Sequence, residues 1–223
     1  MKREIIITAD GSSTIHLPEW NEQYHSKHGA IQEAMHVFIK NGLSLFSNTK
    51  ISILEIGFGT GLNSYITFIE AKKLNLKVNY VGVEAYPVAS NEINKLNYAT
   101  ELNSNETKSI FTEMHQQNWE TEIKISPHFY LTKRKQFFNE ITDENTFNLI
   151  YFDAFGAQVQ PELWTEEIFK IMYLALKKDG VLVTYSAKGS VRRAMQSVGF
   201  TVERLPGPPG KREMLRAKKT AKK

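Results

Sequence analysis

Short apolar runs alternate along the chain with longer segments in which apolar residues recur at helical spacing. A short apolar run is typical of a buried strand, and recurrence at every third or fourth position is typical of an amphipathic helix. The predicted strands cover residues 51–56, 78–83, 147–152 and 181–185. The predicted helices cover residues 62–74, 87–96, 106–117, 161–176 and 190–198, and Asp179-Gly180 is expected to end the fourth. Strands separated by helices indicate a mostly parallel sheet.

The N-terminal segment precedes this alternation. Residues 4–8 and 14–16 predict two short strands around Asp10-Gly11, a strong hairpin signal. A polar connector then leads to a helix over residues 29–45. We expect three parts, namely an N-terminal hairpin and capping helix (1–48) packed on a main domain (49–217), and a basic tail (218–223).

The C-terminal segment predicts a pair of strands, over residues 200–205 and 213–217, with no helix between them. Two strands joined without a crossover helix should pair antiparallel. The predicted fold is therefore a doubly wound α/β sheet, mostly parallel, with an antiparallel C-terminal hairpin edge. Ligands of such sheets bind outside the carboxyl ends of the strands, at the point where the strand order reverses.

Composition narrows the class of protein. The chain has 223 residues, 41% of them hydrophobic, which suits one domain with a sizeable core. Because there is no cysteine, disulfides, thiolate zinc sites and a thiol nucleophile are excluded. Three consecutive aliphatic residues near the N-terminus are too few for a signal peptide, and no segment approaches the length of a membrane span. We expect a cytoplasmic protein with no membrane partner.

The positive charge is concentrated at one end of the chain. The formal net charge is +4, yet residues 211–223 contain seven Lys and Arg against one Glu, so the remainder is slightly acidic. Such a local basic segment attracts phosphates without making the whole molecule a nonspecific polycation binder. A solvated, frayed tail is the alternative interpretation of the last six residues.

Three glycines at alternate positions, Gly57, Gly59 and Gly61, follow the strand over 51–56. Their missing side chains permit a tight turn and a close approach of the backbone to a ligand. Leu62 stands where the dinucleotide fingerprint requires glycine, and Gly61-Leu62-Asn63 replaces the end of a phosphate-binding P-loop. The loop instead resembles the S-adenosylmethionine loop of class I methyltransferases.

Two acidic residues and one amide accompany this loop. Glu84 ends the second strand, where a carboxylate can accept both ribose hydroxyls of an adenosine, although a strand-end turn is the alternative role. Glu55 either anchors the methionyl ammonium through the loop or accepts hydrogen bonds from backbone amides. We also expect Asn63 to bind the cofactor. Residues 129–135 contain no acidic residue, so no side chain is assigned to the adenine.

Asp153 directly follows the apolar run over 147–152. A carboxylate in that position avoids a high burial cost only at the open end of the strand, which places it at the ligand crevice. There it can hold an attacking amine and stabilise the positive charge that passes from sulfur to nitrogen, or it can serve as a turn residue. Four aromatic residues are candidates either for stacking a splayed base or for the core and its rim: Tyr24, Phe155, Trp164 and Tyr185.

Several motif blocks in this order resemble the MnmD family of tRNA methyltransferases. The resemblance covers residues 19–217. The blocks are Gln23-Tyr-His-Ser26 with Gly29 and Glu33, Glu55-Ile-Gly-Phe-Gly-Thr-Gly-Leu-Asn63, Asp153-Ala-Phe155, Pro161-Glu-Leu-Trp-Thr165, Thr184-Tyr-Ser-Ala-Lys-Gly189, Val191-Arg-Arg193, Gly199-Phe200 and Gly207-Pro-Pro-Gly-Lys-Arg-Glu213.

The resemblance implies a methyl transfer from S-adenosylmethionine to the primary amine of 5-aminomethyl-(2-thio)uridine at the tRNA wobble position. It implies no metal and, in this chain, no FAD, so that a separate oxidase or another upstream enzyme makes the amine. Asp153 is then the catalytic residue, which either orients the amine or relays its proton. Candidates for anticodon-stem phosphates are Lys188, Arg192, Arg193, Lys211 and Arg212.

Two other functions stay open from the sequence. A class I methyltransferase acting on another amine, of a protein or a small molecule, shares the glycine loop and Glu84 but has no use for a basic tRNA-binding face. A noncatalytic RNA-binding protein that kept the fold needs the basic face but no cofactor.

Overall fold

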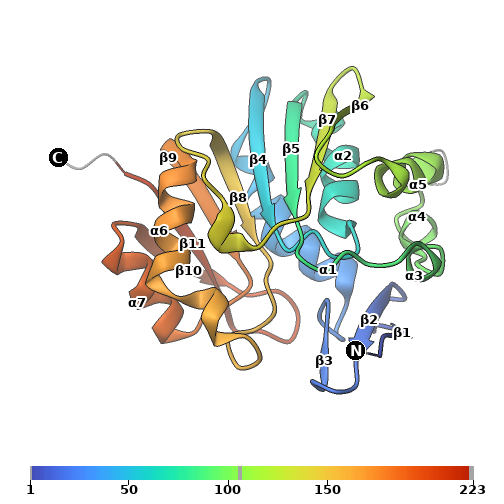
Figure 1. Cartoon of the computed structure of the whole chain (residues 1–223), viewed down its shortest axis with the longest axis horizontal. Helices are drawn as coiled ribbons and strands as arrows, with labels where there is room; N and C mark the ends of the chain where they lie inside the picture. Colours follow the sequence, from blue (N-terminus) through green and yellow to red (C-terminus); the bar gives the residue numbers. More distant parts are fainter. Residues whose placement is uncertain (1, 105–106, 221–223) are drawn as a thin grey trace.

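Eight strands form the central sheet of the part of the chain that the computed structural model describes, residues 2–104 and 107–220 (Figure 1). Their order is β10-β11-β9-β8-β4-β5-β7-β6. The parallel strands are β9 (Leu176–Thr184), β8 (Phe147–Phe152), β4 (Lys50–Ile56), β5 (Lys77–Val83) and β7 (Phe129–Arg134). The predicted hairpin edge is confirmed, because β10 (Thr201–Pro206) pairs antiparallel with β11 (Glu213–Lys218), and β11 pairs antiparallel with β9.

The opposite edge of the sheet is a second antiparallel pair, which the sequence pattern did not predict. There β6 (Glu122–Ser126) pairs with β7. Phe129, Leu131 and Lys133 alternate as buried positions along β7. The third buried position is a lysine, so the alternation of apolar and polar residues that predicts a strand is interrupted there. Burial of Lys133 is possible because its Nζ donates a hydrogen bond to the His115 carbonyl at 2.8 Å.

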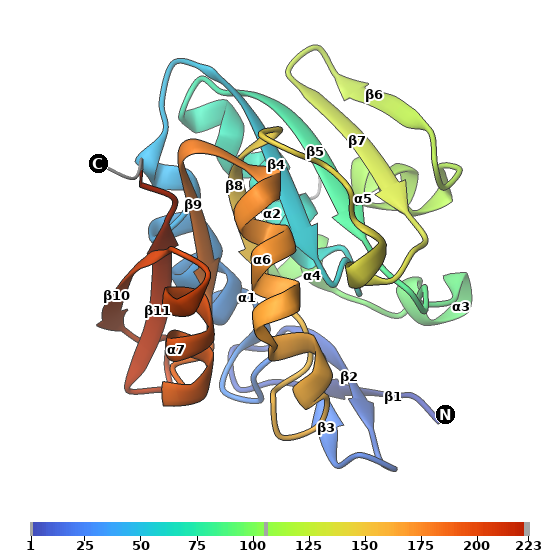
Figure 2. The ribbon, with the colours of Figure 1, turned by 60° about the vertical axis from the view of Figure 1, so that its left-hand side comes forward.

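The parallel strands are apolar on both faces, and each face is covered by helices. In β4, Ile51 and Ile53 pack into one core, whereas Leu54 and Ile56 pack into the other. Side chains of α6 and α7 fill the second core, on the face turned forward in Figure 2. The main helices are α1 (Ala30–Ala34), α2 (Leu62–Lys73), α5 (Lys108–Gln116), α6 (Glu166–Ala175) and α7 (Gly189–Ser197).

Three predicted helices differ in extent from those observed. The helix expected over 87–96 is only α3 (Ser90–Ile93), which α4 (Tyr98–Glu101) follows. The helix expected over 161–176 is divided into a 3-10 turn, η5 (Pro161–Trp164), and α6, because Thr165 caps α6 by accepting a hydrogen bond from the Ile168 amide. The helix expected over 29–45 passes from α1 into a π-helix, η1 (Met35–Lys40), and a 3-10 turn, η2 (Leu43–Leu45). Glu106, the first residue of the helix expected over 106–117, lies outside the described residues.

Asp179-Gly180 lies inside β9 and does not end a helix. Helix α6 already stops at Ala175, since Leu176 pairs with Phe147 of β8. The Asp179 amide donates to the Lys219 carbonyl at 2.9 Å, so the described part of the predicted basic tail continues the pairing beyond β11. Residues 221–223 of that tail lie outside the described residues.

The N-terminal residues form a small antiparallel sheet of β1 (Glu4–Ile7), β2 (Ser13–Leu17) and β3 (Glu22–Gln23), which confirms the predicted hairpin. The Ser13 amide donates to Asn97 Oδ1 at 2.7 Å, which ties β2 to the segment before α4. In Figure 1 this small sheet lies below the carboxyl ends of the parallel strands. Of the helices in the described ranges, none has the length and apolar character needed to cross a membrane.

Candidate active site

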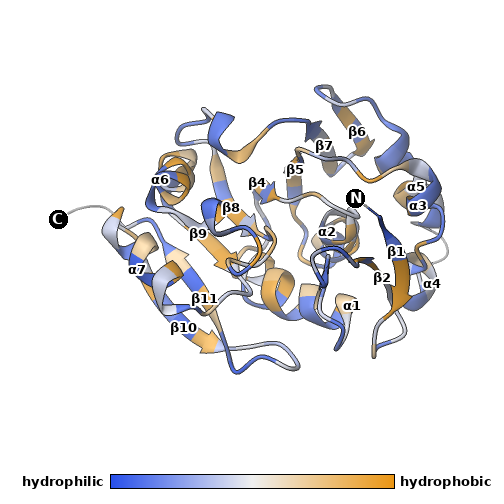
Figure 3. Cartoon of the chain, turned by 60° about the horizontal axis from the view of Figure 1, so that its bottom comes forward, coloured by the Kyte–Doolittle hydropathy of each residue, from blue (hydrophilic) through white to orange (hydrophobic). Residues whose placement is uncertain are grey.

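A cleft of about 1470 Å³ opens at the carboxyl ends of β4, β5 and β8. The chain proceeds from β4 to β5 in one direction along the sheet and from β8 to β9 in the other, so the cleft lies at the switch point where such sheets bind ligands. Figure 3 turns this end forward, with the N-terminal sheet on one side and the β10–β11 hairpin on the other. Residues of both, together with the loops that follow the three strands, line the cleft.

The loop after β4 brings bare backbone to the cleft. Gly57 and Gly59 line it and have φ angles of 86° and 50°, which favour glycine. A Cβ atom on Gly57 would lie 2.6 Å from the Asp153 carbonyl oxygen, and one on Gly59 would lie 3.1 Å from the Tyr24 ring. Gly61 lies behind the lining as the N-cap of α2. The loop therefore exposes backbone amide groups to the cleft and leaves room for a ligand where side chains would otherwise lie.

Glu84 joins this loop to the loop after β5. Its Oε2 accepts a hydrogen bond from the Gly59 amide at 3.0 Å, and its Oε1 accepts one from the Tyr86 amide at 2.9 Å. The carboxylate also lines the cleft, as a ribose-binding residue must. Beyond it, Tyr86 and Phe137 are 65% and 51% exposed and meet edge to face, with ring centroids 6.0 Å apart. They form an apolar surface next to Glu84.

Asn63 connects two carboxyl groups beneath the cleft. Its Nδ2 donates to Glu55 Oε1 at 2.9 Å and to Asp153 Oδ2 at 2.8 Å. Within the described residues, Glu55 Oε2 and Asn63 Oδ1 are buried without a hydrogen-bond partner. Burial raises the pKa of Glu55 well above its usual range. Glu55 itself lies below the lining and contacts the Asn63 side chain, so its expected role in the cofactor site is exerted through Asn63.

Asp153 lies at the end of β8, and its amide donates to the Ile56 carbonyl at 2.9 Å, which fixes it beside the glycine loop. Burial raises the pKa of its carboxyl to about 7. The negative charge of Glu33 contributes to this increase, whereas the Asn63 hydrogen bond and the Lys211 charge lower the pKa and oppose it. The carboxyl group can therefore exchange a proton near neutral pH, which suits both roles considered for it.

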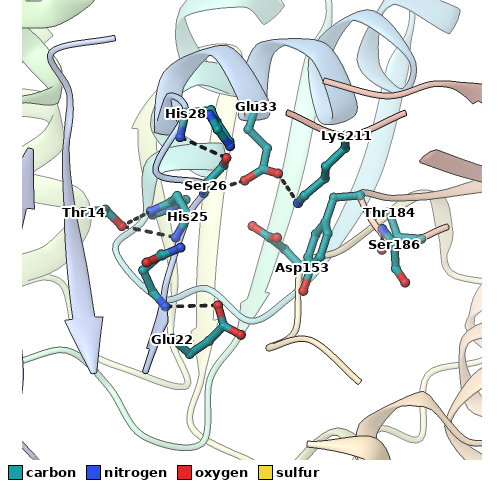
Figure 4. Close-up of polar contacts among 12 residues, drawn as sticks. Thr14, Glu22, His25, Ser26, His28, Glu33, Asp153, Thr184, Ser186 and Lys211 are labelled. Atoms are coloured by element: carbon teal, nitrogen blue, oxygen red, sulfur yellow. Dashed lines mark hydrogen bonds and ion pairs between the residues drawn. The ribbon is translucent and has the colours of Figure 1, made fainter. Parts of the chain in front are cut away.

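Lys211 reaches this region from the turn between β10 and β11. Its ammonium forms an ion pair with Glu33 of α1 and lies 3.8 Å from the centroid of the Tyr185 ring. Figure 4 shows the ammonium beside the carboxylates of Glu33 and Asp153. The structure thus places Lys211 inside the cleft rather than among the phosphate-binding candidates on the surface.

The other basic candidates lie outside the cleft. Lys188 precedes α7, and Arg192 and Arg193 belong to that helix, while Arg212 follows Lys211. Lys188, Arg193 and Arg212 are exposed and Arg192 is half-buried, and none of the four lines the cleft.

The aromatic candidates separate into two groups. Tyr24 and Phe155 line the cleft and meet edge to face at 5.0 Å, and Tyr185 lines it next to Lys211. Trp164 is buried away from the cleft, where its Nε1 donates to the Phe155 carbonyl at 2.7 Å and supports the loop that carries Phe155. The structure adds Trp20, which contacts the other side of Phe155 at 5.7 Å.

Sequence reasoning omitted Glu33 and Trp20 from the site. Glu33 had a detectable signal, because this carboxylate stands among the buried positions Ala30 and Ala34 of α1, where an uncompensated charge is costly. Trp20 had no such signal in the sequence, because a single tryptophan in a polar connector belongs to no periodic pattern that would indicate what it contacts.

The cleft as a whole fits an adenosyl ligand that carries an ammonium group. Gly59 leaves room for it, Glu84 offers a carboxylate at the strand end, and the Glu55–Asn63 pair holds unpartnered oxygens below. A search of the described residues finds no group of three or more His, Asp or Glu arranged to hold a metal ion.

Comparisons with known proteins show which family the chain resembles. Two curated relatives named tRNA 5-methylaminomethyl-2-thiouridine biosynthesis bifunctional protein MnmC are similar to this chain. The one from Leptospira borgpetersenii is 30% identical over 89% of this chain and 32% of its own length, and the one from Hydrogenovibrio crunogenus is 25% identical over 87% and 31%. The chain thus spans about a third of the length of these relatives.

A solved structure, MnmC2 from Aquifex aeolicus, shares the fold with a TM-score of 0.77, at 24% identity over 99% of this chain and 72% of that one. Together these matches confirm the resemblance that the motif blocks indicated. A family profile described as S-adenosyl-L-methionine-dependent methyltransferase matches residues 98–220, more than half of the chain. The chain therefore belongs to this family of S-adenosyl-L-methionine-dependent methyltransferases.

Proposed function

We propose that this chain transfers a methyl group from S-adenosylmethionine to the primary amine of 5-aminomethyl-(2-thio)uridine at the tRNA wobble position, giving 5-methylaminomethyl-(2-thio)uridine. The observation that carries the proposal is the position of Asp153. One hydrogen bond from Asn63 links it to the cofactor side of the cleft, and the aromatic residues Tyr24 and Phe155, which contact each other, line the same cleft. The names of the two MnmC relatives include the modified nucleoside, 5-methylaminomethyl-2-thiouridine.

The cofactor side is formed by the glycine loop and Glu84. Gly59 leaves room for the adenosyl group, and Glu84 accepts hydrogen bonds from the ribose hydroxyls. Tyr86 and Phe137 form an apolar surface for the adenine. Asn63 Oδ1 accepts a hydrogen bond from the methionyl ammonium, and the buried Glu55 holds the Asn63 side chain in place. When bound, S-adenosylmethionine supplies an electrophilic methyl group, and the bond from sulfur to this carbon breaks as the nitrogen–carbon bond forms, so that S-adenosylhomocysteine is the product.

The acceptor side is formed by Asp153 and the aromatic residues. Phe155, flanked by Trp20 and Tyr24, stacks on the splayed uracil ring. Asp153 holds the aminomethyl nitrogen and stabilises the positive charge that develops on it as the methyl carbon is transferred. The reaction takes place in the cytoplasm, where tRNA is modified, and a separate oxidase or another upstream enzyme forms the amine.

Nucleoside mass spectrometry tests this proposal directly. The protein is incubated with methyl-labelled S-adenosylmethionine and with tRNA from a strain that accumulates 5-aminomethyl-(2-thio)uridine. We expect this nucleoside to disappear as the labelled 5-methylaminomethyl nucleoside appears. Label found only in added proteins or small amines, with the tRNA unchanged, would favour the alternative methyltransferase. Binding of tRNA without any binding of S-adenosylmethionine would favour a noncatalytic protein.

The basic residues near α7 are proposed to contact anticodon-stem phosphates. Replacing Lys188, Arg192 and Arg193 together with glutamine should weaken tRNA binding about tenfold or more at moderate salt, and should reduce the slope of log affinity against log salt by about two to three. Electrophoretic mobility shift or fluorescence anisotropy over a salt series measures both.

A matched variant uses Lys72, Lys73 and Lys77, which are exposed where α2 ends and β5 begins, opposite the cleft. Replacing these three with glutamine removes the same charge but should leave the salt slope within about one unit of the wild type. Equal losses in the two triple variants would show that only the net charge matters.

A further inference from the structure

Three charged side chains from distant parts of the chain meet on the acceptor side of the cleft. Glu33 comes from α1, Asp153 follows β8, and Lys211 lies in the turn between β10 and β11 (Figure 4). The pKa of Asp153 responds to both others, since Glu33 raises it and Lys211 lowers it, so the three charges lie within range of one another. The proposed acceptor amine enters this same space.

Both neighbours of the Lys211 ammonium are themselves held in place. One oxygen of Glu33 pairs with Lys211, and the other accepts a hydrogen bond from the Ser26 amide at 2.8 Å. The Tyr185 ring faces the ammonium at 3.8 Å, and its hydroxyl donates to the Ala154 carbonyl at 2.8 Å, directly after Asp153. The Lys211 side chain is 32% exposed and that of Glu33 only 9%. Such an ammonium is a fixed charge rather than a mobile surface cation.

A positive charge in this place favours the acceptor chemistry. An alkylamine that resembles the lysine side chain has a pKa of about 10.4 in water. At neutral pH almost all of it is therefore protonated, and an ammonium has no free lone pair with which to attack the methyl group. Asp153 and Glu33 stabilise that ammonium and so oppose the loss of its proton. A neighbouring cation has the opposite effect on both the amine and Asp153.

We propose that Lys211 is a positioning residue of electrostatic function, whose fixed ammonium favours the neutral form of the acceptor amine and the ionised form of Asp153. The proposal rests on the proposed function, because it concerns the amine that the enzyme methylates. It gives Glu33 the part of holding and partly neutralising that cation. It also removes Lys211 from the set of phosphate-binding residues.

The other ionisable groups around Lys211 and Asp153 do not supply this effect. The carboxyl groups near the cleft floor act in the same direction as Glu33, and Tyr185 is neutral because burial raises its pKa well above the usual range. Arg3, which also lines the cleft, is engaged by Glu92 at 3.1 Å and by the Tyr86 carbonyl. The other basic groups that line the cleft are His25, His28 and Lys27, and Lys27 is exposed, so that solvent screens its charge. The remaining titratable groups that line it are Tyr24, Tyr86, Glu22, Glu84, Glu162 and Glu167, and Glu55 lies below them.

The single-turnover rate of tRNA methylation, measured from pH 6 to pH 10, tests the proposal. In Lys211→Gln, the acid limb of the profile should move about one pH unit upward, so that the rate falls about tenfold at pH 7 and approaches the wild-type rate at pH 10. Lys211→Arg keeps the charge and should keep the wild-type limb. Glu33→Gln removes the opposing charge and should move the limb to lower pH.

Two controls separate this role from phosphate binding and from a structural role. Arg212→Gln removes a charge from the same turn but outside the cleft, and should weaken tRNA binding without moving the acid limb. Lys211→Gln should change the tRNA dissociation constant less than Arg212→Gln does. Binding of S-adenosylmethionine by each variant, measured by calorimetry, shows that the fold and the cofactor site persist.

The outcomes are distinct. A Lys211→Gln profile that overlays the wild type, or that falls equally at every pH up to 10, overturns the inference and leaves the proposed function intact. A wild-type protein that methylates no tRNA amine overturns the proposed function instead. An upward shift in Lys211→Gln together with a downward shift in Glu33→Gln supports the inference.

Discussion

Asp153→Asn is expected to lower the single-turnover rate of methyl transfer at least about 100-fold while leaving the affinity for S-adenosylmethionine within about threefold. During transfer, positive charge moves from sulfur to the attacking nitrogen, and only an ionised carboxylate at that point stabilises it. The asparagine oxygen can still accept the hydrogen bond from Asn63, so the cofactor side keeps its geometry. Rapid-quench kinetics with labelled cofactor, and calorimetry without tRNA, measure the two quantities.

The same variant should be more stable than the wild type at alkaline pH. The pKa of Asp153 rises to about 7 in the folded protein because of burial, from 3.8 in the unfolded chain. Between these two pKa values the folded protein holds the proton that the unfolded chain has released, so the wild type loses stability as the pH rises from about 4 to about 7, and the loss levels off above pH 7. Asp153→Asn should gain about 1–3 kcal/mol at pH 8, a gain that disappears near pH 4. Thermal denaturation at the two pH values checks this and shows that lost activity is not lost folding.

A matched carboxylate is available in Asp179, which is exposed in β9 and has a φ angle of 63° that asparagine tolerates. Asp179→Asn should leave both the rate and the stability close to those of the wild type. An Asp153→Asn enzyme with normal single-turnover methylation would remove Asp153 from the reacting centre. A loss of cofactor affinity as large as the loss of rate would place it on the cofactor side instead.

Gly59→Val is expected to abolish measurable binding of S-adenosylmethionine, a loss of at least about 100-fold in affinity. Valine is strained at the φ angle of 50°, and its Cβ would lie 3.1 Å from the Tyr24 ring. Its methyl groups would occupy the space above the loop, and the Gly59 amide would lose its alignment with Glu84. Isothermal titration calorimetry measures the affinity.

Gly199→Val is the control for backbone strain alone. Gly199 has a φ angle of 108° and lies outside the cleft lining, and a Cβ atom there would lie 3.4 Å from the Tyr173 ring. This variant should lose stability to a similar degree and still bind the cofactor. Normal affinity in folded Gly59→Val would show that the ligand does not approach this loop.

The strand and helix pattern could be read from the sequence because buried strands of a parallel sheet are continuous apolar runs. Asp153 was found for the same reason, since a carboxylate directly after β8 has few other places to lie. Boundaries were harder where tertiary contacts decided them. Leu176 continues the helical spacing of apolar residues, but it lies in a strand because it pairs with Phe147 of β8. Lys133 can lie in a buried strand because its ammonium donates a hydrogen bond to the His115 carbonyl.

By itself, then, the sequence determined the fold class, the glycine loop, Glu84 and Asp153, all of which are local features of one strand and the turn that follows it. Two features are decided only by the tertiary structure. Lys211 of the basic C-terminal segment forms an ion pair with Glu33 beside Asp153, and the buried Trp164 donates a hydrogen bond to the loop that carries Phe155. The physical reason is that 178 residues separate Glu33 from Lys211. Their contact depends on the tertiary fold, which brings α1 beside the turn between β10 and β11, and no local sequence pattern indicates it.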